Sequence, residues 1–159
     1  MDAYMRKLQN DLVTLGTGIV ILSIWTLVKA VLYCVVYWND IVSSVSANDL
    51  GPLLAIIIAM LILEFVLHSY VGLTARSEGN GAKKSIVYLV FTVIIILLYA
   101  VMIITEFVSM FLTEGIILTD IITIVIDSTS LAFLLNMLVS SLRLRKLKKS
   151  ITTKEEAAS

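Results

Sequence analysis

The sequence predicts an all-α, polytopic membrane protein, folded as an antiparallel four-helix transmembrane bundle with both termini cytoplasmic. Three observations predict this fold class: the composition, four long apolar windows, and the placement of Lys and Arg. Hydrophobic residues make up 59% of the 159 positions and charged residues only 15%, and the mean hydropathy is +1.00. Soluble domains carry about 25% charged residues, so this composition excludes an ordinary soluble domain.

The four apolar windows are each long enough to cross a bilayer. A helix needs about 20 apolar residues to span roughly 30 Å of hydrocarbon. We predict spanning helices at about 12–38, 52–74, 85–109 and 116–142. Pro52 opens the second window, and proline is well suited to the first turn of a helix.

The segments between the windows are short and polar. Residues 39–51 are rich in Asn, Asp, Ser and Gly, residues 76–84 read RSEGNGAKK, and the third joint lies near 113–115. Joints this short leave no room for a soluble domain and make consecutive helices antiparallel neighbours. We therefore predict one transmembrane domain, residues 12–142, between a cytoplasmic N-terminal segment, 1–11, and a basic cytoplasmic tail, 143–159.

The orientation follows from Lys and Arg, which are retained on the cytoplasmic side in short loops. Eleven of the twelve lie before the first window, between the second and third, or after the fourth, and only Lys29 lies within a window. The sequence therefore predicts a multi-pass protein of the cell membrane with its N- and C-termini in the cytoplasm.

Ionisable residues within the windows are the candidate functional groups, because a charge at the centre of a spanning helix costs about 2.5–3.5 kcal/mol. At 1.5 Å of rise per residue, three of them lie within about 5 Å of the midplane. These are Lys29, Glu64 and Asp127, on three different windows. One cation and two carboxylates at matched depth can neutralise one another when the helices pack.

Further polar residues continue the same helix faces. Tyr99 belongs to a series spaced by seven that includes Thr92 and Glu106, and Asp120 lies seven residues before Asp127. A spacing of seven keeps residues on one face of a helix in a left-handed bundle. His68 lies one turn from Glu64. The expected layers are Glu106 with Asp120 outside, Tyr99 with the three central charges, and His68 with Thr92 nearest the cytoplasm.

The first functional hypothesis is a small channel or transporter-like protein that moves protons or another cation along this polar pathway. Carboxylate and imidazole groups inside membrane proteins typically mark such routes. The pathway residues are Lys29, Glu64, His68, Tyr99, Glu106, Asp120 and Asp127. The competing structural interpretation is that these polar groups only fix the packing of the helices.

Two other functional classes stay open. The chain could be a non-enzymatic anchor, sensor or immunity-type subunit that acts through a soluble cytoplasmic protein. An intramembrane enzyme is the third hypothesis, but the sequence has no phosphate-binding Gly-rich loop, no nucleophile elbow and no Arg within a predicted window. We therefore expect no enzymatic activity and no catalytic residue.

A metal site would have to combine Glu64 with His68, which share a face at i, i+4, and Asp127 as a third ligand. The chain has one histidine and one cysteine and lacks the two-His zinc motif. We expect neither a metal nor a cofactor.

The basic tail suggests contacts at the membrane surface. Anionic headgroups attract basic residues next to a spanning helix by about 1 kcal/mol each. The candidate lipid or partner contacts are Arg143, Arg145, Lys146, Lys148 and Lys149. Asn136 lies about 180° around its helix from Asp127, which favours a homo-oligomer. We expect no direct contact with nucleic acid.

Overall fold

The computed structural model describes residues 2–36, 38–82, 85–112 and 118–156, and all regular secondary structure in these residues is helical. Its helices are α1 (Asp2–Val36), α2 (Trp38–Ser44), α3 (Ala47–Gly79), α4 (Val87–Leu112) and α5 (Leu118–Glu156). Four of them, all but α2, are long and apolar enough to cross a membrane. The all-helical prediction with four candidate spans is thus confirmed.

Each long helix extends beyond its predicted window at one end or both, although α1 ends at Val36 rather than at 38 and α4 begins at Val87 rather than at 85. α1 begins at Asp2 and α5 continues to Glu156, so the segments expected to flank the transmembrane domain are continuous with its helices. Leu8 and Leu144 from these extensions are buried in one cluster with Leu12, the first residue of the first predicted window. The joint 39–51 contains the short helix α2, and α3 begins before Pro52, which lies inside the helix. The joint predicted near 113–115 lies outside the described residues.

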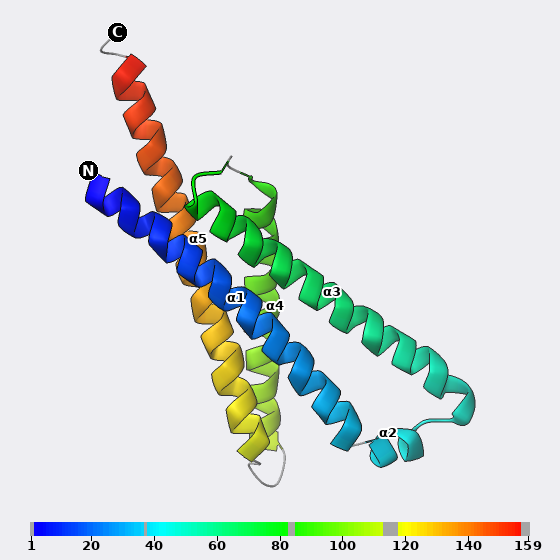
Figure 1. Ribbon diagram of the computed structural model, residues 1–159. Coiled ribbons are helices and arrows are strands. Elements are labelled where there is room, and N and C mark those ends of the chain that lie inside the picture. Colours follow the sequence, from blue (N-terminus) through cyan, green and yellow to red (C-terminus); the bar gives the residue numbers. More distant parts are fainter. Residues whose placement is uncertain (1, 37, 83–84, 113–117, 157–159) are drawn as a thin grey trace.

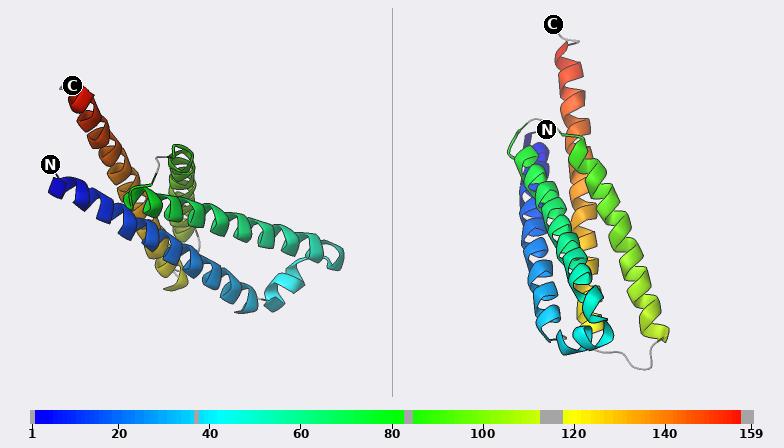
Figure 2. Two further views of the ribbon diagram at one scale, coloured as in Figure 1. Left: turned by 45° about the horizontal axis from the view of Figure 1, so that its top comes forward. Right: turned by 90° about the vertical axis from the view of Figure 1, so that its right-hand side faces the viewer.

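Successive long helices run in opposite directions (Figure 1). The start of α1, the end of α5 and the turn after α3 lie at one end of the molecule, which we call the terminal end. The opposite end, with α2, we call the loop end. The most extensive packing is between α1 and α3, followed by α1 with α5 and α4 with α5. α3 and α4 diverge from one another toward the loop end (Figures 1 and 2), so the bundle is tightest near the terminal end.

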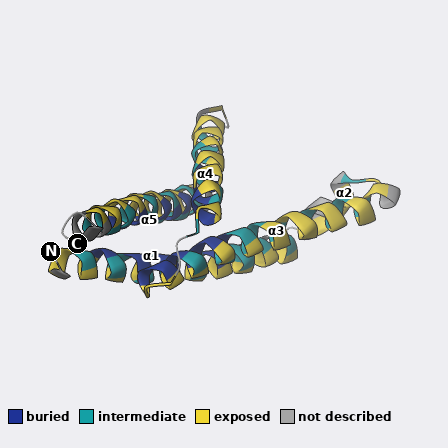
Figure 3. Ribbon diagram, turned by 90° about the horizontal axis from the view of Figure 1, so that it is seen from above, coloured by how far each residue is buried: buried dark blue, intermediate teal, exposed yellow. Residues whose placement is uncertain are grey.

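Close approach of α1 and α3 depends on glycine. A methyl group on Gly72 would lie 2.6 Å from the backbone oxygen of Gly16, and a methyl group on Gly16 would meet the backbone oxygen of Gly72. Only residues without a side chain allow two helix backbones this close. Buried residues line the inner faces of the helices and exposed ones the outer faces (Figure 3), as expected for helices that face lipid.

Candidate functional site

Each long helix turns a regularly spaced face toward the interior. Inward-facing positions recur every three or four residues, the spacing that keeps side chains on one face of a helix. On α3 this face carries Glu64, His68, Val71, Ala75 and Glu78; on α4 it carries Tyr88, Thr92, Ile95 and Tyr99; on α5 it carries Asp127, Ser130, Leu134, Met137 and Ser141. Apart from Thr92, which lies between them on α4, the polar residues fall into two groups, separated along the helices by a mostly apolar layer.

The first group, which we call the central cluster, consists of Lys29, Glu64, His68, Tyr99 and Asp127. Tyr99 stands at its centre and is 5% exposed. Its hydroxyl lies close to the hydroxyls of Thr26 and Ser130 and interacts electrostatically with the carboxylates of Glu64 and Asp127. Side chains from all four long helices therefore meet around one tyrosine.

Asp127 is the most buried carboxylate of the central cluster, at 5% exposed. Lys29 on α1 is close enough for the two charges to interact. A carboxylate in so apolar a setting needs an opposite charge, or a bound proton or cation, to offset its lost hydration. The structure thus brings Lys29, Glu64 and Asp127 into one cluster, with Lys29 as the nearby positive charge.

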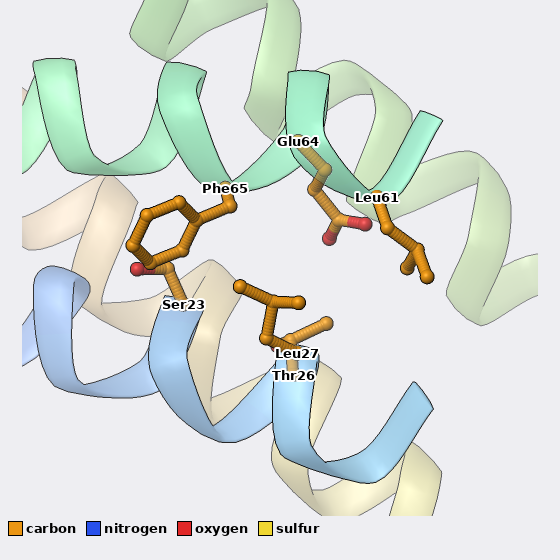
Figure 4. A pocket seen from close by; sticks show the side chains of 6 residues that line it. All are labelled: Ser23, Thr26, Leu27, Leu61, Glu64 and Phe65. Atoms are coloured by element: carbon orange, nitrogen blue, oxygen red, sulfur yellow. The ribbon is translucent and has the colours of Figure 1, made fainter. Parts of the chain in front are cut away.

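Glu64 reaches into a small cavity between α3 and α1 (Figure 4). Ser23, Thr26 and Leu27 line it from α1, and Leu61 and Phe65 line it beside Glu64. The cavity has a volume of about 10 Å³, close to the smallest that holds one water molecule. The wall is mostly apolar, and the hydroxyls of Ser23 and Thr26 donate to backbone oxygens of α1.

His68 packs directly on Tyr99. The two rings are 5.6 Å apart between centroids and meet edge to face at 77°. His68 is 6% exposed, and its Nδ1 lies 2.9 Å from the backbone oxygen of Glu64. His68 thus belongs to the central cluster itself. The Thr92 hydroxyl donates to the backbone oxygen of Tyr88, and the placement of His68 with Thr92 in one layer stays a prediction.

The predicted outer layer is described only in part. Glu106 and Ser109 line a hollow of about 210 Å³ between α4 and α5, together with Met110 and Thr123. This hollow lies toward the loop end, two helical turns beyond Tyr99. Asp120 lies within α5, but its side chain lies outside the part of the chain that is described.

An apolar layer closes the central cluster toward the terminal end. Val71, Ala75, Ile95, Leu134 and Met137 are buried there in one hydrophobic core. From His68 to the next inward-facing charge on α3, Glu78, the layer extends about 15 Å at the helical rise. Water and ions do not cross such a layer without rearrangement of the helices.

The second polar group, which we call the terminal cluster, consists of Glu78, Tyr88, Ser141 and Arg145. Glu78 is 1% exposed and Arg145 15%. Arg145 donates from Nε to Oε1 of Glu78 at 2.8 Å and from Nη2 to Oε2 at 2.6 Å; Nη2 also donates to the backbone oxygen of Ser85. Such a two-bond pairing is the strong form of the Arg–carboxylate interaction.

Tyr88 completes the terminal cluster. Its hydroxyl donates to Oε2 of Glu78 at 2.6 Å, so the contact with Ser141 Oγ at 2.7 Å must be donated by the serine. The Arg145 guanidinium also lies 5.5 Å from the centre of the Tyr88 ring. One buried carboxylate therefore ties α3, α4 and α5 together.

The turn after α3 explains why Glu78 is available for this role. Gly81 has a φ of +92°, the left-handed conformation that glycine adopts without strain. Gly81 N–H donates to Glu78 O and Ala82 N–H to Ser77 O, the paired bonds of a Schellman motif. The helix therefore continues through residues 76–79, which the sequence predicts to be part of a flexible turn.

Sequence reasoning does not identify the terminal cluster. A signal is present, because Glu78 follows Glu64 by fourteen residues and Ser141 follows Asp127 by fourteen, two repeats of seven in each case. Arg145, predicted to contact lipid or a partner, instead points inward to Glu78. Its neighbours Arg143, Lys146 and Lys149 are exposed on α5, whereas Lys148 is half-buried.

Among the described residues, no group of three or more His, Cys, Asp or Glu side chains is placed to hold a metal ion. Comparison with known proteins gives no family model, no curated protein and no solved structure that matches the chain. Fold and site together define a protein of four apolar helices compatible with a multi-pass membrane protein, with ionisable groups from all four helices in its interior.

Proposed function

We propose that this protein is a small, non-enzymatic channel or transporter-like protein that moves protons or another small cation through its interior. The observation that carries the proposal is the central cluster: two carboxylates from different helices near one buried tyrosine, with a single lysine as counter-charge. Lys29 interacts with Asp127, and two acidic groups with one lysine near them can exchange a proton or ion at low cost when neither is held in a fixed salt bridge.

The route runs from the loop end to the central cluster. Glu106 and Ser109 line the hollow between α4 and α5 at the outer side, and Glu64 and Asp127 are the exchange sites. The apolar layer and the terminal cluster close the other side. In this proposal the closed terminal end represents one state of an alternating-access cycle, in which the transported species reaches the central cluster from the loop end.

We place the protein in the cell membrane with the terminal end in the cytoplasm. The basic residues support this orientation, because Arg6, Lys7, Arg76 and the basic residues of 143–149 all lie toward the terminal end. The species would therefore enter from outside the cell.

Ion flux into proteoliposomes tests the proposal. Purified protein is reconstituted with a trapped pH-sensitive dye, and separately with labelled Na⁺ or K⁺ outside. Wild type should carry protons or one of these cations. Asp127→Asn keeps the size of the side chain but removes its charge and should reduce the flux about tenfold or more.

Asp49→Asn is the matched control, because Asp49 is exposed in the first turn of α3, away from the central cluster. It should conduct like wild type. The proposal is wrong if wild type carries none of the three ions, or if Asp127→Asn and Asp49→Asn conduct equally.

The basic extension of α5 supports a second candidate function, an anchor or sensor subunit that docks a soluble cytoplasmic protein or anionic lipid. This part of α5 extends past the other helices (Figure 1) and exposes Lys146 and Lys149. Because Leu144 and most of Arg145 are buried, removal of the whole tail would damage the bundle. Lys146→Gln with Lys149→Gln is the cleaner variant, and unchanged binding to anionic vesicles and unchanged recovery of any copurifying protein would argue against this function.

A further inference from the structure

His68 has an unusual hydrogen-bonding state for a buried side chain. Its Nδ1 lies 2.9 Å from the backbone oxygen of Glu64. A carbonyl oxygen can only accept, so Nδ1 carries the hydrogen, and Nε2 of the neutral ring is left as an acceptor. Nε2 is buried and has no hydrogen-bond partner among the described residues.

A buried acceptor without a partner is costly, and natural structures seldom keep one without a reason. The ionisable residues that contact His68 are Glu64, one turn earlier on α3, through its backbone oxygen, and Tyr99 on α4, through its ring. Tyr99 in turn interacts with the carboxylates of Glu64 and of Asp127 on α5, and Asp127 interacts with Lys29 on α1. The two carboxylates favour a positive charge in this region. The free lone pair is therefore suited to a cationic hydrogen-bond donor.

The choice of cation follows from the number of ligands. A metal ion needs at least three well-placed ligands, and the described residues contain no such group of His, Cys, Asp and Glu. The cavity beside Glu64, at about 10 Å³, is close to the smallest that holds one water molecule. His68 itself does not line this cavity, but the single free lone pair of its Nε2 can bind one proton and cannot by itself hold a metal ion.

We infer that the species taken up by the central cluster is the proton, and that Nε2 of His68 accepts it. The inference rests on the proposed transport function and specifies its substrate. A hydronium ion at the cluster gives its proton to Nε2 and leaves as water; the resulting imidazolium keeps its Nδ1–H bond to Glu64 and lies near two carboxylates. The proton then passes to a carboxylate or to water, and the ring returns to the same neutral tautomer.

Nitrogen NMR of the full-length protein in lipid bilayers tests the proton state directly. The chain contains a single histidine. If the affinity tag contains no histidine, ¹⁵N-histidine labelling therefore gives the NMR signals of one imidazole ring. At neutral pH the spectrum should show a protonated Nδ1 and an unprotonated Nε2. Acidification should convert Nε2 to a protonated nitrogen. A neutral ring with hydrogen on Nε2, or no change on acidification, overturns the inference.

Flux measurements provide the second test. In His68→Asn, the amide can still donate to the Glu64 carbonyl in place of Nδ1, but the group at Nε2 is lost. Proton flux should fall about tenfold or more, while helix content by circular dichroism stays at the wild-type value. Ser69→Ala, at the neighbouring half-buried position about 100° around α3, should conduct like wild type.

The outcomes separate the two proposals. Absence of flux of any ion in wild type refutes the transport function itself. Flux of Na⁺ or K⁺ without protons, or wild-type proton flux in His68→Asn, leaves transport standing and refutes the role of His68.

Discussion

Arg145 and Glu78 form a buried, doubly hydrogen-bonded ion pair between the end of α3 and the last part of α5, across 67 residues of sequence. Glu78 is 1% exposed, and its carboxylate also accepts a bond from Tyr88. The pair holds the terminal end together while the helices diverge toward the loop end. This difference between the two ends is what makes the terminal cluster the closed side of the proposed pathway.

Removal of one partner of this pair should destabilise the protein strongly. In Glu78→Gln the guanidinium of Arg145 keeps its charge without a carboxylate, and breaking a buried pair in this way costs about 3–5 kcal/mol. The free energy of unfolding in mixed micelles measures the loss. Arg143→Gln changes an exposed neighbour and should cost less than about 0.5 kcal/mol. Equal effects of the two variants would contradict the assigned role of the ion pair.

The Tyr88 hydroxyl should contribute a smaller but measurable stabilisation. Tyr88→Phe keeps the buried ring and removes the group that links Glu78 to Ser141, leaving both with one bond fewer. We expect a loss of about 1–3 kcal/mol, measured as above. Tyr4→Phe is the control, since Tyr4 is 50% exposed. A Tyr88→Phe protein as stable as wild type would show that the hydroxyl bonds contribute nothing.

Glycine at the α1–α3 contact should be essential for packing. In Gly72→Ala the new methyl group would lie 2.6 Å from Gly16 O and 2.9 Å from Val20 Cγ2. The helices must separate, at a cost of about 1–3 kcal/mol. Gly51→Ala places its methyl group where nothing lies within 4 Å and should stabilise α3 by about 0.5–1 kcal/mol. Thermal unfolding of both variants checks the prediction, and a shift of the same sign would contradict it.

We expect a homo-oligomer that uses the outer face of α5. Asn136 is exposed there, whereas Asp127 on the opposite face is buried. An amide facing lipid gains about 1–2 kcal/mol by hydrogen bonding to another helix. Asn136→Leu should therefore shift the protein toward the monomer in sedimentation equilibrium in detergent. Ser128→Ala, also at an exposed position of α5, is the control, and an unchanged subunit count in Asn136→Leu would exclude this contact.

The sequence determined the helices and the faces they turn inward. Apolar length is a local property, so the four long helices follow from composition alone. The face shared by Glu64 and His68, or by Asp127 and Ser130, follows from helical periodicity. For this reason the amino-acid sequence by itself predicts Lys29, Glu64 and Asp127 at one depth in the bundle.

Only the tertiary structure decided which groups pair. Counting residues along the helix axis predicts that His68 lies in a layer closer to the cytoplasm than Tyr99. In the structure the two rings are in contact. Helix tilt shifts the depth of a side chain in the membrane away from the value obtained by counting residues. The residues around Glu78 are typical of a turn, so the sequence predicts Glu78 in a loop. Its side chain is held in the interior by Arg145, which is distant in sequence. Long-range pairing depends on which helix ends meet in space, and the hydropathy of the sequence contains no information about which ends meet.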